Sequence, residues 1–337
     1  MILKTCPSTL KTGFTTYCPS ARKKVFFGKA VSHILPFLPP EQDEQVNALF
    51  LENRARISLS GVQKKLSLTL RKNHLSLADG DMFGLYILKP IPDDLIDATQ
   101  IPANEHLTMQ LAEQVFGINT AANAMIFFRD NQPAYITRRF DRTFTGEKFA
   151  AEDFATLAGK TRQTAGEDFK YEGDYENLFR ILKTHVGAYK LESKRLFRLI
   201  VFNYVFSNGD AHLKNFSLLE TINGDYLLSP AYDLICSRLH VDDPDLALKD
   251  GLFSDETETE SFRANGFYAY DDFFLLGQRA GLEEEIIKEE IQLFLTGKDK
   301  VTELVRRSFL SAQNQNRYLG LFESKLARLA YSFANRL

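Results

Sequence analysis

The sequence predicts an α+β fold, in which an antiparallel, β-rich N-terminal part precedes a mainly helical C-terminal part. Short β-prone runs separated by turn signals fill much of residues 57–89. Helical periodicity dominates after Asp141. One β-hairpin, with Asn223-Gly224 in its turn, interrupts the helices just after a polar cluster.

The N-terminal part contains the predicted sheet. A lead-in segment, residues 1–55, is expected to wrap on the body and to carry a short helix near 41–53. The β-rich part spans residues 56–140. Its predicted strands are 57–60, 66–71, 75–78, 85–89, 124–128 and 134–139. A helix is expected over 102–116, because Pro102 suits a first helical turn and Gly117 suits a C-cap.

The C-terminal part, residues 141–337, is predicted to hold the remaining helices and the hairpin. The helices are expected at 151–157, 175–185, 191–206, 282–295, 300–312 and 316–336. The hairpin strands are expected at 215–220 and 226–229. The polar stretch 160–174 is expected either to touch substrate or ATP or to be a flexible loop, and 255–260 is predicted to be a solvated loop.

Composition limits the classes of function. The 337 residues carry a net charge of −3, so no global field for nucleic acid exists and no direct nucleic-acid binding is expected. Three scattered cysteines do not make a disulfide framework, which favours a reducing cytoplasm. The longest apolar stretch, 196–206, is too short to span a bilayer, and no secretory signal is evident, so no membrane association is expected.

The polar cluster at residues 207–216 breaks a buried apolar helix. Asp210 and Asn215 stand five residues apart, the separation found in kinase catalytic loops. A carboxylate there accepts the proton of an attacking hydroxyl, and a nearby amide oxygen holds Mg²⁺. The spacing therefore predicts phosphoryl transfer, with Asp210 as the base.

A second carboxylate, Asp233, returns to this loop after the hairpin, 18 residues beyond Asn215. Mg²⁺ prefers oxygen ligands together with phosphate oxygens, so Asn215 and Asp233 are predicted to share the metal. Typical kinases have Phe-Gly after this aspartate, whereas Leu234-Ile235 follows here. A conventional activation-loop switch is therefore not indicated.

Charge neutralisation of a phosphoryl donor is predicted at the end of a strand, where Lys89 would reach the phosphates of ATP and pair with Glu105. The loop 58–65 joins strands where a phosphate-covering loop belongs, although it has a single glycine. Its side chains and backbone N–H groups could cradle phosphate. The candidate ATP contacts in this loop are Ser60, Gly61, Val62 and Gln63.

Two further residues of the polar cluster are assigned to the catalytic set. No second histidine stands near His212 to make a metal site, so His212 is predicted to hold the loop by hydrogen bonds. Lys214 lies one residue before Asn215 and is grouped with Asp210 and His212 as a catalytic residue.

At these residues the chain resembles the HipA family of bacterial toxin kinases. The matching segments are 57–65, 87–90, 104–105, 139–142, 208–216 and 230–234, of which the last two are the most specific. The lead-in before residue 57 is too short for the long N-terminal subdomain of larger HipA proteins. In that respect the chain is similar to the short HipT toxins of three-component HipBST systems.

The resemblance implies a bilobed, protein-kinase-like serine/threonine kinase that uses ATP and Mg²⁺. It implies that the protein substrate is an aminoacyl-tRNA synthetase, whose phosphorylation halts translation, and that HipB-like and HipS-like antitoxin proteins are partners. The backbone of 138–140, including Arg138 and Phe140, would form the adenine hinge, with Asp141 near the ribose. Ser58 and Ser60 map to the family's autophosphorylated loop serines.

Three other classes of function compete with this interpretation. A small-molecule phosphotransferase of the aminoglycoside-kinase type also uses Asp, Asn and a second Asp, but His212 follows Asp210 here instead of preceding it. A catalytically silent pseudokinase conflicts with the presence of all four chemical positions, including Lys89. A metal hydrolase built on Asp210, His212 and Asp233 lacks a further ligand set.

Overall fold

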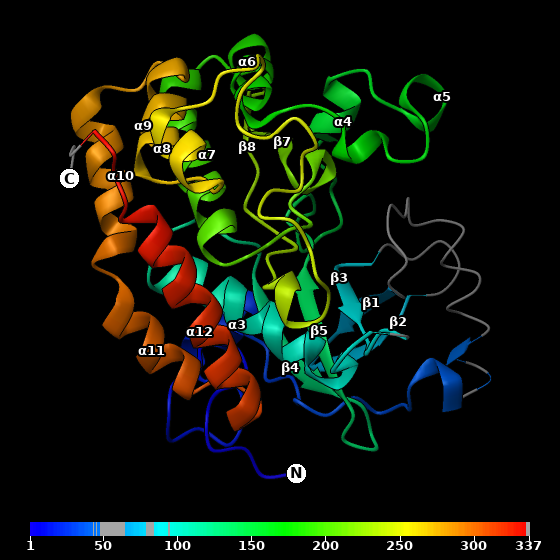
Figure 1. Ribbon diagram of the computed structural model, residues 1–337. Helices are drawn as coiled ribbons and strands as arrows, with labels where there is room; N and C mark the ends of the chain where they lie inside the picture. The colour runs from blue at the N-terminus through cyan, green and yellow to red at the C-terminus, as the bar shows by residue number, and fades with distance from the viewer. Residues whose placement is uncertain (43, 45, 48–64, 79–83, 94, 335–337) are drawn as a thin grey trace. The chain divides into compact units, whose positions relative to one another are not determined.

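The N-terminal sheet is antiparallel throughout. It appears in a computed structural model that describes residues 1–42, 44, 46–47, 65–78, 84–93 and 95–334 (Figure 1). The strands run β2-β1-β3-β5-β4 across the sheet. They are β1 Leu66–Arg71, β2 His74–Leu77, β3 Tyr86–Lys89, β4 Asn123–Phe127 and β5 Pro133–Arg138. Within β1 burial alternates along the strand, as expected for a strand with one face on a core.

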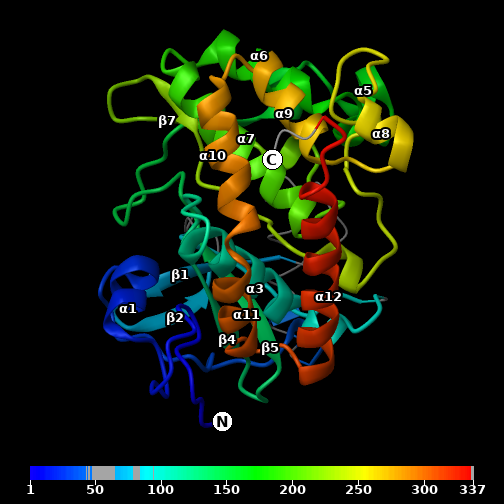
Figure 2. The ribbon, with the colours of Figure 1, turned by 60° about the vertical axis from the view of Figure 1, so that its left-hand side comes forward.

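Helices predominate over strands after residue 150, and several of them surround α7 (Figure 2). The helices are α1 Pro19–Phe26, α3 Ile101–Gln114, α4 Phe154–Leu157, α5 Arg162–Ala165, α6 Tyr175–His185, α7 Tyr189–Val205, α8 Glu260–Asn265, α9 Tyr270–Arg279, α10 Glu284–Leu295, α11 Lys298–Arg306 and α12 Ala312–Leu329. Short 3-10 turns are η1 Pro40–Gln42, η2 Ala98–Gln100, η3 Phe169–Tyr171, η4 Leu213–Asn215 and η5 Ser237–Leu239. Helix α7 is buried over most of its length and packs against α6 and α10.

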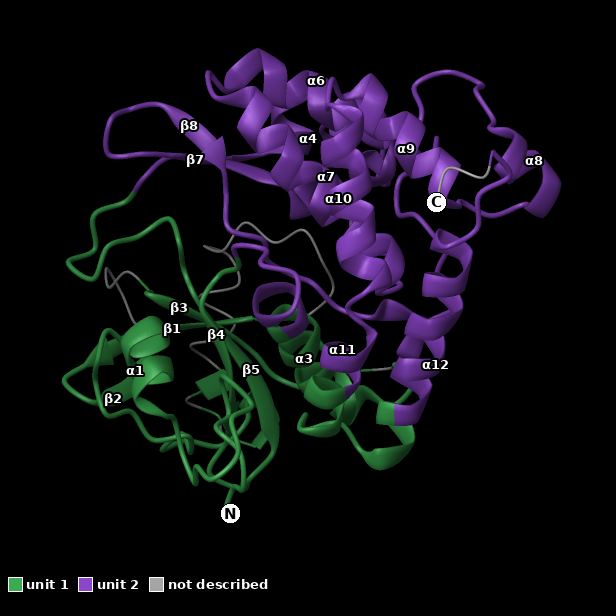
Figure 3. Cartoon of the chain, turned by 90° about the vertical axis from the view of Figure 1, so that its left-hand side faces the viewer, with its two compact units in different colours: residues 1–110, 120–148, 303–315 green, residues 111–119, 149–302, 316–337 purple. Residues whose placement is uncertain are grey.

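The chain divides into two compact units (Figure 3). Unit 1 comprises residues 1–110, 120–148 and 303–315, and unit 2 comprises 111–119, 149–302 and 316–337. The sequence predicts the boundary between the β-rich part and the helical part at 140/141. Unit 1 instead continues to residue 148 and includes residues 303–315. Such a return of the chain depends on contacts between remote segments, which local patterns do not encode.

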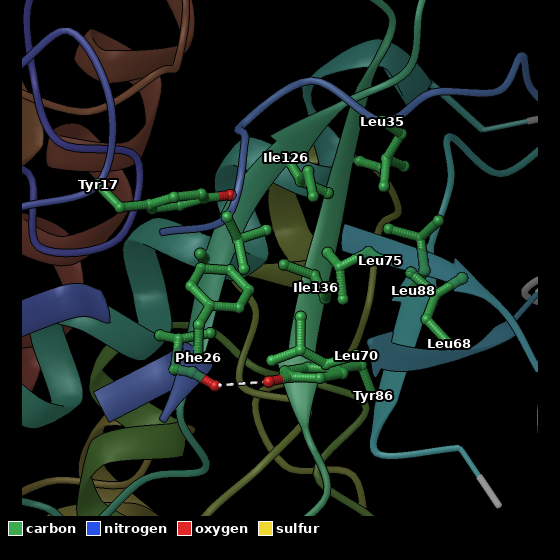
Figure 4. Close-up of a cluster of buried hydrophobic side chains, with 14 of the residues drawn as sticks. Tyr17, Phe26, Leu35, Leu68, Leu70, Leu75, Tyr86, Leu88, Ile126 and Ile136 are labelled. Atoms are coloured by element: carbon green, nitrogen blue, oxygen red, sulfur yellow. Dashed lines mark hydrogen bonds between the residues drawn. The ribbon is translucent and has the colours of Figure 1, made fainter. Parts of the chain in front are cut away.

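The core of unit 1 lies between the sheet and the N-terminal segment (Figure 4). The hydroxyl of Tyr86 on β3 donates to the carbonyl of Val25 in α1, 3.0 Å away. Tyr17 donates to the carbonyl of Met125 on β4 at 2.8 Å. Buried aromatic rings whose hydroxyls are satisfied stabilise a core without a polar penalty. Much of the predicted lead-in is therefore integral to the N-terminal fold.

Aromatic stacking builds much of the core of unit 2, in line with a chain that contains 28 Phe. Phe116 stacks on Phe294 of α10 with centroids 4.6 Å apart. Phe202 stacks on Phe206 at 4.4 Å, and Phe206 stacks on Phe322 of α12 at 5.1 Å. This cluster fixes the end of α7, from which the polar loop emerges.

The predicted helix at 151–157 is wrong in its first turn. Residues Ala151–Asp153 form β6, which pairs with β7 Ser217–Glu220, and β7 pairs with β8 Tyr226–Leu228. Helix α4 starts only at Phe154, because the Asp153 carboxylate accepts the backbone N–H of Thr156 as an N-cap. The three strands form a small sheet in the order β6-β7-β8.

Other helix boundaries also differ from the predicted ones. The helix expected over 300–312 ends at Arg306, and the next helix begins at Ala312 instead of residue 316. Helices α1, α5, α8 and α9 are not among the predicted ones. In α9 the acids Asp271 and Asp272 are buried, and hydroxyl groups of Ser261, Ser332 and Thr259 donate to them, so an inward-facing polar pair obscures the helical pattern. None of the described helices has the length and apolar character needed to cross a bilayer.

Candidate active site

The loop that carries Asp210 follows α7 and is fixed at both ends. Asn208 is bound to Asn203 through its backbone N–H and through its side-chain amide, both at 2.9 Å. The backbone N–H of Gly209 donates to the hydroxyl of Ser237 at 2.9 Å. A Cβ on Gly209 would lie 2.4 Å from the Cβ of Asp243, so only glycine permits this approach. The loop backbone is thus set by packing.

Asp210 presents a half-exposed carboxylate, with 50% of its side chain accessible. The Tyr171 hydroxyl donates to its Oδ1 at 2.6 Å. Across the described residues Oδ2 accepts no hydrogen bond. The carboxylate therefore has one restrained oxygen and one available oxygen, as a proton acceptor requires.

His212 supports the loop through its backbone. Its N–H donates to the Asp210 carbonyl at 2.8 Å, and its own carbonyl accepts from the N–H of Asn215 at 2.9 Å. The ring does not hold the loop by hydrogen bonds as predicted: Nε2 is 3.8 Å from Asp210 Oδ1, and Nδ1 has no partner among the described residues. Burial lowers the pKa of His212 to about 4, with a partial opposing effect of Asp210, so the ring is neutral at pH 7.

Lys214 forms an ion pair with Asp153, in which Nζ lies 2.8 Å from Oδ2. Both side chains are mostly buried. Because Asp153 also caps α4, this pair joins the loop to the β6–α4 connection. The structure thus places Lys214 in a contact that positions the loop, whereas the sequence grouped it with the catalytic residues.

Asn215 and Asp233 are brought back to one loop region by the β7–β8 hairpin. The hydroxyl of Tyr232 donates to the carbonyl of Lys214 at 2.8 Å and lies 2.5 Å from Ser217 Oγ. Asp233 has a left-handed backbone, with φ of 55°, which aspartate tolerates better than most residues. The negative charge of Asp233 also acts to raise the pKa of the buried His212 ring, against the larger lowering effect of burial.

The donor set fits Mg²⁺ better than a metal held by protein alone. Asn215 is 9% exposed, and its Oδ1 is buried without a hydrogen-bond partner among the described residues. An amide oxygen in that state suits a hard cation. The described part of the chain has no group of three or more His, Cys, Asp or Glu side chains that could hold a metal. A site of one amide and one carboxylate would need phosphate oxygens and water to complete it.

Buried polar atoms without partners are concentrated in the loop. Four such atoms in the described residues fall within residues 207–215. They are Ser207 Oγ, Asn208 Oδ1, His212 Nδ1 and Asn215 Oδ1. Because an unsatisfied buried polar atom is costly, this concentration indicates a place where water, ion or ligand atoms complete the hydrogen bonding.

The predicted phosphate-binding lysine lies in unit 1, at the end of β3. Lys89 Nζ is 2.6 Å from Glu105 Oε1 of α3, and the side chains are 5% and 3% exposed. The ammonium also lies 5.5 Å from the centroid of the Tyr135 ring. The structure contains the ion pair that the sequence suggested.

The predicted adenine and ribose contacts lie at the end of β5 and in the segment that follows it. The Arg138 guanidinium stacks over the ring of Phe27, 4.5 Å from its centroid. Arg139 binds Asp141 through two hydrogen bonds, of 2.9 and 2.7 Å. Burial alone would raise the pKa of Asp141, but these bonds and the charge of Arg139 lower it overall. Phe140 is partly buried.

Some predicted positions cannot be placed. Ser58, Ser60, Gly61, Val62 and Gln63 lie outside the described residues.

Two further residues belong to the site without being predicted from the sequence. Tyr171 contacts Asp210 from 39 residues earlier in the chain. It lies inside the stretch 160–174, for which the sequence leaves open a loop or a contact with substrate or ATP, and no local signal marks the tyrosine itself. Asp153 was assigned to a helix. Its signal was the N-cap pattern, an aspartate three residues before Thr156 at the start of a helix.

Residues 57–299 match the HipA-like C-terminal domain family. The chain belongs to this family. The match covers the polar loop, the hairpin, Lys89 and Glu105, so the resemblance stated from the motifs is confirmed.

Relatives of this HipA-like chain include kinases. It is 26% identical over 313 residues to a Haemophilus influenzae protein named "Putative kinase", covering 88% of each chain. It is 26% identical over 238 residues to the serine/threonine-protein kinase toxin HipA of Shewanella oneidensis, covering 65% of this chain and half of that protein.

Solved structures support the fold. The S. oneidensis HipA chain, in a complex with HipB and its operator DNA, matches with a TM-score of 0.60 at 20% identity, covering 81% of this chain and 64% of that one. The Helicobacter pylori proinflammatory kinase CtkA matches with a TM-score of 0.52 at 14% identity, covering 78% and 93%. The HipA-like chain therefore has the predicted α+β kinase fold.

Proposed function

We propose that the chain is an ATP-dependent serine/threonine protein kinase toxin. The observation that carries the proposal is the loop–hairpin arrangement of unit 2. There, one loop carries the half-exposed carboxylate of Asp210 and the buried amide oxygen of Asn215, which has no hydrogen-bond partner among the described residues. The hairpin returns the chain to this loop next to Asp233, where the Tyr232 hydroxyl donates to the carbonyl of Lys214. Membership of a family that contains a serine/threonine kinase toxin supports the same conclusion.

Each residue has a chemical role in the proposed reaction. Asp210 accepts the proton that the acceptor hydroxyl loses as its oxygen bonds to the γ-phosphorus of ATP and ADP departs. Asn215 and Asp233 would hold Mg²⁺, which supplies neutralisation of the phosphate charge when bound. Lys89, oriented by Glu105, would contact the phosphates.

The nucleotide base and sugar are assigned to the end of β5 and the segment that follows it. The backbone of 138–140 would bind adenine, as a hinge does, and Asp141 would meet the ribose. In the structure Asp141 is held by Arg139, so this pair would also fix the direction of the segment.

The test is a comparison of wild type with Asp210→Ala, which removes the proton acceptor and leaves the buried residues of the loop in place. We expect wild-type protein with Mg²⁺ and ATP to phosphorylate itself and a protein substrate, and the variant to do neither. Phosphoproteomics after expression of both proteins reports the substrate. No differential phosphosite would refute the proposal; label transfer only to aminoglycosides or sugars would make the chain a small-molecule phosphotransferase.

The biological role proposed is inhibition of translation within a HipBST-like toxin–antitoxin system. An aminoacyl-tRNA synthetase is the proposed substrate, and HipB-like and HipS-like proteins are the proposed partners. The complex of S. oneidensis HipA with HipB supports an antitoxin partner. Co-expression with candidate antitoxins, scored by cell growth and co-purification, tests this part separately from kinase activity.

Autophosphorylation is proposed to silence the enzyme through Ser58 or Ser60. A phosphoserine adds about −1.5 to −2 charge, which in a phosphate-covering loop repels the nucleotide. We expect Ser58→Asp or Ser60→Asp alone to lower kcat/KM for ATP roughly ten-fold, since one added like charge near phosphate costs on the order of 1–2 kcal/mol. Ser→Ala at the same positions is the matched control and should keep activity. Equal rates for the Asp and Ala forms would contradict the proposal.

A further inference from the structure

Tyr171 contacts the carboxylate that the proposed function makes the catalytic base. It is the last residue of η3, and its hydroxyl donates to Asp210 Oδ1 at 2.6 Å. Both residues belong to unit 2. Among the described side chains, Tyr171 is the one that donates a hydrogen bond to this carboxylate, so this contact decides which oxygen is restrained.

The backbone around Tyr171 is hydrogen-bonded to residues Lys249 and Asp250. The N–H of Lys249 donates to the Tyr171 carbonyl at 2.9 Å, and the N–H of Asp250 donates to the Gly173 carbonyl at 3.0 Å. The ammonium of Lys249 binds Glu172 at 2.6 Å and Asp168 at 3.3 Å. Bonds on both sides of Tyr171 therefore set where its side chain starts.

The ring of Tyr171 is held as well. It lies edge-on to the His212 ring, with centroids 5.2 Å apart and an angle of 76° between the planes. The ammonium of Lys170 lies 4.8 Å from the Tyr171 centroid. A ring fixed at its backbone and on its faces places its hydroxyl with little loss of conformational freedom when the contact forms.

The Tyr171 hydroxyl stays protonated and can therefore donate its hydrogen bond throughout the physiological pH range. Burial, followed by the nearby charge of Asp210, raises the pKa of Tyr171 well above its ordinary value, so the phenol keeps its proton at any physiological pH. The other ionisable groups that face this phenol are His212, Lys170, Asp168 and Asp243. Asp210 Oδ1 is thereby occupied, while Oδ2 stays available among the described residues.

We propose that Tyr171 is the positioning residue of the catalytic base: its hydroxyl holds Oδ1 of Asp210 and leaves Oδ2 to receive the proton of the acceptor hydroxyl. This inference rests on the proposed function, because it assumes that Asp210 is the base. The residue acts through Asp210 and transfers no atom itself. A catalytic base is commonly oriented by a third group, and in the described contacts Tyr171 is that group for Asp210.

The experiment is Tyr171→Phe, which removes one oxygen and keeps the ring contacts. A hydrogen bond to a charged group corresponds to roughly a ten-fold change in rate or more, so we expect kcat to fall about ten-fold while KM for ATP is unchanged. The acidic limb of the pH–rate profile should move to higher pH, because a donated hydrogen bond favours an ionised carboxylate.

Tyr175→Phe is the matched control. The Tyr175 hydroxyl donates to the backbone carbonyl of Ala211 in the same loop at 2.9 Å, so its loss tests a merely structural contribution. We expect that variant to unfold at lower temperature with the pH–rate profile of wild type. A Tyr171→Phe enzyme with wild-type kcat and pH profile would overturn the positioning role, and so would one with a higher kcat, which would make Tyr171 a competitor of the acceptor.

The failure of this inference can be told apart from failure of the proposed function. If Asp210→Asn keeps full activity, Asp210 is not the base, and the assignment of the reaction fails whatever Tyr171 does. If Asp210→Asn is inactive and Tyr171→Phe is unchanged, only the positioning role fails.

Discussion

Asp233→Asn is expected to lower the rate of phosphoryl transfer about a thousand-fold while leaving the fold intact. A metal that neutralises phosphate charge contributes several kcal/mol to the transition state, and each 1.36 kcal/mol is a factor of ten in rate. Asp233 has a φ of 55°, and asparagine adopts that left-handed conformation as readily as aspartate. The substitution therefore removes the charge with little backbone strain.

The measurement is the initial rate of autophosphorylation or substrate phosphorylation over a range of Mg²⁺ concentrations. A metal ligand should show partial recovery at high Mg²⁺ or with Mn²⁺, whereas a folding defect would not. Asp242→Asn is the matched control, because the Asp242 side chain is 97% exposed near the same segment. Activity of Asp233→Asn within ten-fold of wild type, with the same Mg²⁺ dependence, would exclude a metal-binding role.

Local patterns predicted the elements whose signals are local. The strand at 66–71 and the helix at 175–185 have the predicted bounds, because alternation and 3.6-residue periodicity are properties of short windows. The hairpin was found from its Asn-Gly turn. Its strands begin within two residues of the predicted positions.

The elements that were missed depend on contacts remote in sequence. Residues Ala151–Asp153 form a strand only because β7, more than sixty residues later, supplies a partner. The α9 helix buries two acids that Ser261, Ser332 and Thr259 satisfy, so its inward face does not look apolar. The missing information was the identity of the partners, not the propensity of the residues.

The candidate site divides in the same way. Asp210, Asn215 and Asp233 are linked by one loop and one hairpin, so their spacing in the sequence is what predicts that they act together. Tyr171 belongs to a segment whose place is set by bonds to Lys249, and no sequence spacing relates the two. A sequence can therefore indicate the reacting groups while the group that orients them emerges only from the fold.

The buried Lys89–Glu105 pair gives the second large expected effect. Lys89→Met removes the ion-pair partner of Glu105, whose side chain is 3% exposed. Removing one member of a buried ion pair typically costs about 3 to 5 kcal/mol, whereas replacing both by apolar groups of similar size can be nearly neutral. We expect Lys89→Met to lose stability of that order and Lys89→Met with Glu105→Leu to recover most of it.

Activity should separate from stability in this series. If Lys89 contacts phosphate, the recovered double variant remains inactive, with kcat/KM lower by at least about a hundred-fold, because the charge that the transition state needs is absent. Denaturant unfolding and phosphotransfer rates of the two single variants and the double variant complete the cycle.

The exposed pair Lys298–Glu323, with side chains 54% and 49% exposed, is the control. Its double replacement should cost no more than about 1 kcal/mol and leave activity unchanged. A stable Lys89→Met/Glu105→Leu protein with wild-type activity would show that this pair serves the fold alone. If the double variant were as unstable as Lys89→Met, the stability lost in Lys89→Met would not come from the buried charge of Glu105.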